Sequence, residues 1–348
     1  MRKIYAYIVL LLLPLMGSCA GIRYMTIETR EPAQVTLPAG VRKVLIVSNV
    51  AQQPNDIGHN IKKLGKDKFD KTTASSDSVA IYYTEALAQF LGEEEYFDDV
   101  LYSDRQLRRD NNFWLEQPLQ PEVMIEMKNE SGVDAIISLD KLVMQTNRTD
   151  HFHQEGYIYG DISGKIQSVI RVYLPTMDGQ IPAVQFNDSL KWEGYDISDG
   201  RAYAELILPT QEDAMKELAV YAAERMTKVF SAHWEFQDRW LYTSVKSKMR
   251  EADLYAKNHQ WEEAIPIWES VFNRERNKNN RAKTAHNIAV GYEMLDDMEQ
   301  AVKWANTAFD LMMESTTSSS LDFRRSTIYK SEILRRADAS NKLDMQSE

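Results

Sequence analysis

The sequence has 348 residues, of which 43% are hydrophobic and 27% charged, so it is long and apolar enough for two globular domains. Its formal net charge of −11 argues against nucleic acid as a partner, because an acidic chain repels phosphates. Cys19 is the only cysteine, which excludes an intrachain disulfide.

The first nineteen residues have the pattern of an export signal. Two basic residues are followed by an apolar run from Ile8 to Leu13, and two small residues stand directly before Cys19. The run is too short to span a bilayer as a stable helix. The segment resembles bacterial lipoprotein signals. That resemblance implies that residues 1–18 are removed and that the Cys19 thiol carries a lipid. An ordinary cleaved signal with an incidental cysteine, or an uncleaved anchor, is the alternative.

The resemblance also implies a location. Two or more acyl chains hold a protein stably on a membrane, where one chain is marginal. No acidic cluster of the kind that marks surface-exposed lipoproteins in some Gram-negative groups follows Cys19. We therefore expect a lipid-anchored protein of the cell envelope, at the outer membrane and facing the periplasm.

The mature chain is expected to begin with a lipid-anchored tether or a first edge strand over residues 19–40, where two prolines disfavour a central strand. Residues 41–234 then predict a mixed α/β domain. Its expected strands are 43–50, 96–103, 133–144, 157–174 and 181–192, and its expected helices are about 78–91, 121–131 and 210–233. Asp77 or Ser78 is expected to cap the first helix, and Thr210 the last.

The order of these elements predicts a mixed sheet with helices covering one face. It resembles, in topology only, the small α/β domains of other envelope lipoproteins, including the curli-secretion and penicillin-binding-protein-activator types. That resemblance rests on no motif and carries over no residues.

An internal repeat follows Trp240, where the pattern changes to successive helices. Six small or apolar positions recur at an offset of about 37 residues, the first pair being Ala252 and Ala289. The spacing within each unit resembles the tetratricopeptide repeat over about residues 245–312. The family period is 34 residues, so the extra residues are expected to lengthen the turn around 274–280. An unrelated helical hairpin bundle is the alternative.

The repeat predicts a helical domain over 240–340, with two repeats and a capping helix, and hence an α+β fold class for the whole chain. The residues expected to pack the repeat are Ala252, Tyr255, Trp261, Ala264, Trp268, Ala289, Tyr292, Ala301 and Ala305. In this family, ligands lie on the concave face formed by the first helix of each unit, here about 248–257 and 285–294. The resemblance therefore implies a protein or peptide partner bound near Glu251, Lys257, Asn287 and Glu293; solvated surface is the alternative for each of them.

No catalytic motif is expected to operate. Ser138 and Lys141 match S-x-x-K, but that motif needs a helix and here lies in an expected strand. His151 and His153 have no nearby cysteine, so a surface loop is favoured over a metal site. We expect no metal and no cofactor. The last helix is basic, which favours a contact with the acidic body or with an anionic head group near the anchor.

As a whole, the chain resembles the uncharacterised tetratricopeptide-bearing lipoproteins of Bacteroidetes. The expected function is a non-enzymatic adaptor or scaffold that is held to the membrane by Cys19 and binds a protein or peptide. One alternative is a glycan- or peptide-modifying envelope hydrolase, whose site would need Asp140, His151, His153 and Asp161 to converge. Another alternative is a subunit of an envelope oligomer or secretion assembly.

Overall fold

The computed structural model describes residues 21–38, 40–108, 110, 112–152, 158–175, 182–195 and 208–347. The expected signal segment, Cys19 and His153 lie outside these residues. The chain divides into two compact units. The sheet unit is Ala33–His233, and the helical unit combines the chain up to Pro32 with Trp234–Glu348. No helix among the described residues is long and apolar enough to cross a membrane.

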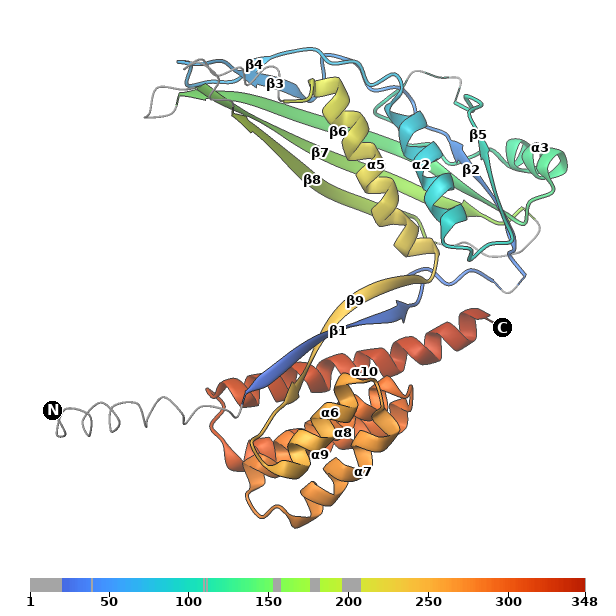
Figure 1. The fold of residues 1–348 in the computed structure, drawn as a ribbon. Coiled ribbons are helices and arrows are strands. Elements are labelled where there is room, and N and C mark those ends of the chain that lie inside the picture. Colours follow the sequence, from blue (N-terminus) through green and yellow to red (C-terminus); the bar gives the residue numbers. More distant parts are fainter. Residues whose placement is uncertain are drawn as a thin grey trace. The chain divides into compact units, whose positions relative to one another are not determined.

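The described residues of the sheet unit form seven strands and three helices (Figure 1). The elements are β2 (Lys43–Ser48), β3 (His59–Lys62), β4 (Asp70–Lys71), α2 (Val79–Glu93), β5 (Asp99–Ser103), α3 (Pro121–Ser131), β6 (Ala135–Phe152), β7 (Ile158–Tyr173), β8 (Val184–Tyr195) and α5 (Gln211–Phe230). β2 lies between β5 and β6 and is parallel to both, whereas β6, β7 and β8 are successively antiparallel. The expected mixed sheet with helices is therefore confirmed.

Helices cover both faces of the parallel part of this sheet, which corrects the prediction that they cover one. Val44 and Ile46 share a core with α2 and α5, whereas Leu45 and Val47 pack with Met127 of α3. The physical reason is the strand order. The crossovers from β2 to β5 and from β5 to β6 run in opposite directions, so right-handed connections put α2 and α3 on opposite faces.

Two details of the expected sheet unit also change. Strand β6 continues beyond Met144 to Phe152, because its polar second half still pairs with β3 and β7. Thr210 caps α5 as expected, since its hydroxyl accepts from the Asp213 N–H at 3.0 Å. Ser78, one of the two residues expected to cap α2, stands at its N-cap, but its side chain makes no capping hydrogen bond.

In the helical unit, the part of the chain that the structure describes forms a two-stranded sheet and five helices (Figure 1). They are β1 (Ile22–Glu31), β9 (His233–Tyr242), α6 (Ser247–Lys257), α7 (Trp261–Arg274), α8 (Lys278–Met294), α9 (Met298–Ser315) and α10 (Leu321–Ser347). Consecutive helices from α6 to α10 pack against one another. The expected all-helical region of packed helix pairs is confirmed.

Strand β1 replaces most of the expected tether. Of the two interpretations of residues 19–40, the structure has a strand over Ile22–Glu31, and its partner is β9. The Gly21 carbonyl accepts from the Thr243 N–H at 2.9 Å, and the Thr29 hydroxyl donates to the Glu235 carbonyl at 3.5 Å. These pairs show that the two strands run antiparallel. The sheet unit is therefore inserted in the chain between the two strands of the helical unit.

Candidate functional site

Small residues allow close helix packing in the helical unit. All nine residues expected to pack the repeat lie in or against one apolar core, and Ala252, Ala264, Trp268, Ala289 and Ala301 are completely buried. Gly291 of α8 shows how near α7 lies, because a Cβ at this position would stand 2.7 Å from Cγ1 of Ile265. The close approach fixes α7 on α8, and α8 also contacts β9.

Helix α8 holds strand β9 by the strand's backbone. The Asn287 side chain accepts from the Tyr242 N–H and donates to the Tyr242 carbonyl, both at 2.8 Å. One residue earlier on α8, Nε2 of His286 lies 2.9 Å from the Trp240 carbonyl. An amide that satisfies both groups of one extended residue is how a groove holds a peptide without depending on its side chain. Here the bound segment belongs to the same chain.

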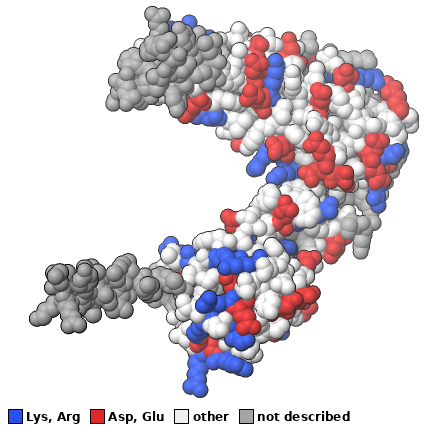
Figure 2. Space-filling model, viewed as in Figure 1, with Lys and Arg blue, Asp and Glu red and all other residues white. Residues whose placement is uncertain are grey.

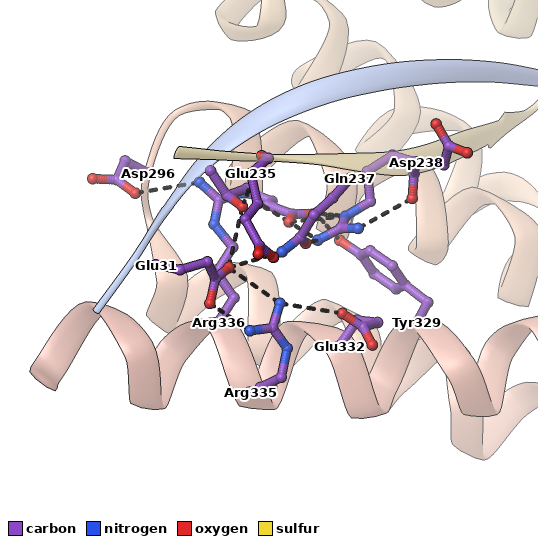
Figure 3. A network of polar contacts seen from close by, with 12 residues as sticks. Glu31, Glu235, Gln237, Asp238, Asp296, Tyr329, Glu332, Arg335 and Arg336 are labelled. Atoms are coloured by element: carbon purple, nitrogen blue, oxygen red, sulfur yellow. Dashed lines mark hydrogen bonds and ion pairs between the residues drawn. The ribbon is translucent and has the colours of Figure 1, made fainter. Parts of the chain in front are cut away.

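A buried ion pair adds side-chain recognition (Figure 3). Arg239 of β9 donates to Glu293 of α8 at 2.8–3.0 Å, and both side chains are at most 3% exposed. Arg336 of α10 donates to the same carboxylate at 2.8 Å, and the Tyr329 hydroxyl donates at 3.0 Å. Burial alone would raise the pKa of Glu293, but Arg239 and Arg336 outweigh it and hold that pKa below its usual value.

The surroundings of this pair also shift two neutral groups. Burial lowers the pKa of His286 to about 4, so the ring is neutral and Nε2–H donates to the Trp240 carbonyl. Burial and the nearby Glu293 carboxylate raise the pKa of Tyr329 well above its ordinary value, so the phenol remains a donor. The cluster is fully satisfied by groups of the chain itself.

A second polar cluster joins both strands to α10. Glu31 of β1 accepts from Gln237 of β9 at 2.8 Å and from Nη2 of Arg335 at 3.2 Å, and Figure 3 shows these groups converging. Glu332 lies 3.5 Å from the same arginine. The basic character of the last helix is thus used in contacts with acidic groups of the body, as one of the two sequence interpretations expected for this helix.

The four residues expected to line a partner site separate into two pairs. Asn287 and Glu293 are each 1% exposed and bind β9, so the structure corrects the expectation that they face an external partner. Glu251 and Lys257 on α6 have exposed side chains that pair with Lys248 at 2.8 Å and Asp253 at 3.2 Å. At Asn287 and Glu293, helix α8 therefore binds the chain's own strand.

Sequence reasoning missed β9 and therefore missed Arg239, Trp240 and Tyr242. A signal was present. Aromatic and polar residues alternate from Trp234 to Gln237, which is the two-residue period of a strand. The segment fell between the expected helix over 210–233 and the expected helical domain over 240–340, so no strand was predicted there. Without β9, no pattern could pair Glu293 with an arginine.

In the sheet unit, the described residues that the hydrolase alternative requires, Asp140, His151 and Asp161, do not converge. Asp140 is completely buried and accepts from Ser138 at 2.6 Å, Arg171 at 2.8 Å and Tyr173 at 2.6 Å. His151 lies 2.6 Å from Asp161, at the other end of β6. Eleven residues along one strand separate Asp140 from His151, or about 35 Å at the usual strand rise. The two polar groups therefore cannot act on one substrate atom.

A cleft of about 500 Å³ lies at the carboxyl ends of β2 and β5, where open α/β sheets usually bind ligands. Asn49, Arg105 and Arg108 line it. The two arginines pair with Glu126 and Asp110 of the same lining at 2.9–3.0 Å, so their charges are already neutralised. No group of three or more metal-binding side chains was found in the described part of the chain. The cleft has the size of a ligand site, but its charges do not indicate a ligand class.

Two family models match the chain. Residues 41–242 match the Domain of unknown function (DUF8603), and residues 250–335 match the Domain of unknown function (DUF6340). No curated protein matches the sequence significantly. The boundary between the matches follows Tyr242, so β9 belongs to the first match in sequence although its last residues pack in the core of the helical unit.

Proposed function

The chain belongs to the family described as Domain of unknown function (DUF8603), and within that family we propose that it is a lipid-anchored envelope protein and a non-enzymatic adaptor. Cys19 would carry the lipid, at the outer membrane and on the periplasmic side. The body would act by contact with a protein or peptide. No nucleic acid, metal or cofactor has a part in this proposal.

The anchor is supported by the N-terminal sequence. A basic start, an apolar run, two small residues and the only cysteine stand in the order of a lipoprotein signal. Strand β1 begins at Ile22, so an acylated Cys19 would be joined to the folded body by only a few residues. A short connection of this kind holds the body at the membrane surface and favours work by contact.

The adaptor role is supported by the helical unit. Its helix pairs and its recurring alanines resemble the tetratricopeptide array, a class of binding modules. The observation that carries the proposal is the grip of α8 on an extended segment through Asn287 and Glu293. This grip on the chain's own strand supports the proposal that the helix stack can also hold a peptide of a partner. With β9 in that groove, we assign the partner to the exposed side of α6, at Glu251 and Lys257.

The separation of Asp140 from His151 supports an adaptor rather than a hydrolase. A two-carboxylate mechanism needs its acids within about 10 Å of each other. Asp161 pairs in register with Thr149 of β6, nine residues beyond Asp140, which places the two carboxylates about 30 Å apart.

Site-specific photocrosslinking in native envelopes tests the proposal. A photoreactive residue at position 257 should give a discrete crosslinked protein, whereas the same residue at Lys303 on α9 should not. The Glu251→Lys variant should weaken the crosslink at position 257. Intact mass should show a diacylated Cys19. An unmodified thiol would contradict the anchor, and equal crosslinking at both positions would contradict the assigned surface.

A further inference from the structure

The helical unit has a basic segment near Gly21, the second residue after Cys19, although the whole protein is acidic. Between Arg274 and Lys283 the sequence has five basic residues and one acid, Glu275, which gives this segment a charge of +4 (5 − 1). The segment contains the last residue of α7, the turn and the first part of α8. In Figure 2 basic side chains gather over the lower end of this unit, where α7 ends in Figure 1.

A hydrogen bond and an ion pair place this segment next to the point where the chain from Cys19 enters the helical unit. Gly21, two residues after Cys19, bonds to Thr243 at 2.9 Å, and Lys246 three residues later forms an ion pair with Glu275. Two residues extend over at most about 7 Å between Cα atoms. The site of lipid attachment and the basic segment therefore share one end of the unit.

The basic residues are only partly neutralised. Lys278 pairs with Glu314 at 2.9 Å and Lys283 with Asp322 at 2.7 Å. Arg274 and Arg276 are exposed, and among the described residues no acidic side chain pairs with either. Clusters of lysine and arginine beside a membrane anchor are attracted to anionic head groups, and the attraction falls off within about a Debye length of about 10 Å.

Exposed aliphatic side chains lie at the same end. Val245 is 68% exposed in the turn between Thr243 and Lys246, and Leu321 is 66% exposed beside Asp322, the partner of Lys283. Basic side chains with a few exposed aliphatics match the boundary between lipid head groups and acyl chains. A protein partner of opposite charge would explain the arginines but not their place next to the anchor.

We propose that the α7–α8 segment Arg274–Lys283, with Val245 and Leu321, lies on anionic lipid head groups beside the anchor, so that the helical unit is the membrane-facing unit. This inference rests on the proposed lipidation of Cys19. The occupant of the surface is the bilayer that the anchor enters. The opposite ends of α6 and α7, near Asn258, face away from it.

Fluorescence quenching by nitroxide-labelled lipids tests this orientation. An acylated Cys19 leaves no other thiol, so Asn273→Cys and Asn258→Cys each give a single labelling site in the full lipidated chain. Both asparagines are exposed, and the 14 residues of α7 separate them by about 20 Å. The dye should be quenched strongly at position 273 and little at 258 in phosphatidylcholine vesicles that contain phosphatidylglycerol.

Charge variants then test the cause. The double variant Arg274→Gln/Arg276→Gln should bring quenching at position 273 close to that at 258, because each arginine near an anionic surface contributes about fivefold in local affinity. Lys63→Gln/Lys68→Gln removes the same charge from an exposed segment of the sheet unit and should change nothing.

Equal quenching at both positions, or no effect of the arginine variant, would overturn the inference while leaving the adaptor proposal intact. Intact mass separates the two failures. A chain whose mass shows no lipid contradicts the proposed anchor, whereas a lipidated chain with an unquenched position 273 contradicts only the orientation.

Discussion

At the scale of single residues, the most consequential group is the Glu293 carboxylate. It is buried and neutralises Arg239. It also forms an ion pair with Arg336 and accepts a hydrogen bond from the Tyr329 hydroxyl. We expect Glu293→Gln to leave Arg239 buried without a counter-charge and to lower the free energy of unfolding by about 3–5 kcal/mol. Urea denaturation followed by tryptophan fluorescence measures this.

The matched control replaces both partners of that pair. In Arg239→Met/Glu293→Leu no charge is left alone in the core, and Arg336, 17% exposed, can turn to solvent. The double variant should be more stable than Glu293→Gln, since apolar replacement of a buried pair is often neutral. A double variant less stable than the single one would show that the pair contributes net stability.

His286 gives the unit a defined sensitivity to acid. Its folded pKa of about 4 lies below the ordinary histidine pKa of 6.5, so the unfolded chain takes up a proton before the folded chain does as the pH falls. The stability that it contributes is present above pH 6.5 and is lost as pH falls toward 4, by about 3 kcal/mol in full. Carboxylates titrate mainly below this window.

Urea midpoints between pH 7 and pH 4.5 measure this loss. The His286→Gln variant should show a flatter dependence, because glutamine can still donate to the Trp240 carbonyl. The same slope in both proteins would mean that another group, such as His59, whose pKa burial also lowers, is responsible.

At the scale of elements, helix packing decides whether a glycine can be replaced by alanine without loss of stability, as Gly291 and Gly92 illustrate. Gly291→Ala places a Cβ 2.7 Å from Ile265 and should lower the free energy of unfolding by about 1–3 kcal/mol, through overpacking between α7 and α8. Gly92 in α2 has open space around it, so Gly92→Ala should be neutral or stabilise by up to about 1 kcal/mol. Thermal melts should show a lower melting temperature for Gly291→Ala and an unchanged or higher one for Gly92→Ala.

The elements also show what the sequence could and could not predict. Helices α2, α3 and α5 fell within a few residues of their expected bounds, because each buries one apolar stripe and carries its pattern in its own residues. Strand β9 was not predicted, since the contacts that hold it come from α8, which lies far from it in sequence. Periodicity predicts that a face is buried, but it does not name the element that covers the face.

The same limit applies to the candidate site. The resemblance to the tetratricopeptide repeat implied a ligand-binding face on the first helix of each unit, with Asn287 and Glu293 among its residues. It could not show that these two residues bind a strand of the same chain. The strand is distant in sequence, since Tyr242, which donates to Asn287, lies 45 residues before it. Lys257 on α6 carries no such contact and stays a prediction.

At the scale of the whole molecule, the sheet unit is inserted in the sequence of the helical unit. β1 and β9 are neighbours in one antiparallel pair, yet about two hundred residues of the sheet unit separate them in sequence. A unit inserted between two adjacent strand ends can be removed if the ends are rejoined. The helical unit should therefore fold without the sheet unit.

A deletion that joins Glu31 to His233 through Asn-Gly tests this independence. The contacts of Gly21 with Thr243 and of Thr29 with Glu235 place Glu31 opposite His233, so a two-residue turn matches the pairing of the two strands. The shortened protein should unfold in one cooperative transition, and its buried Trp240 should keep protection from a fluorescence quencher. A control that also lacks Ile22–Glu31 loses the Glu31 contacts to Gln237 and Arg335 and should be less stable. Equal stability of the two would mean that β1 contributes nothing to the unit, and failure of both to fold would show that the insertion is required for it.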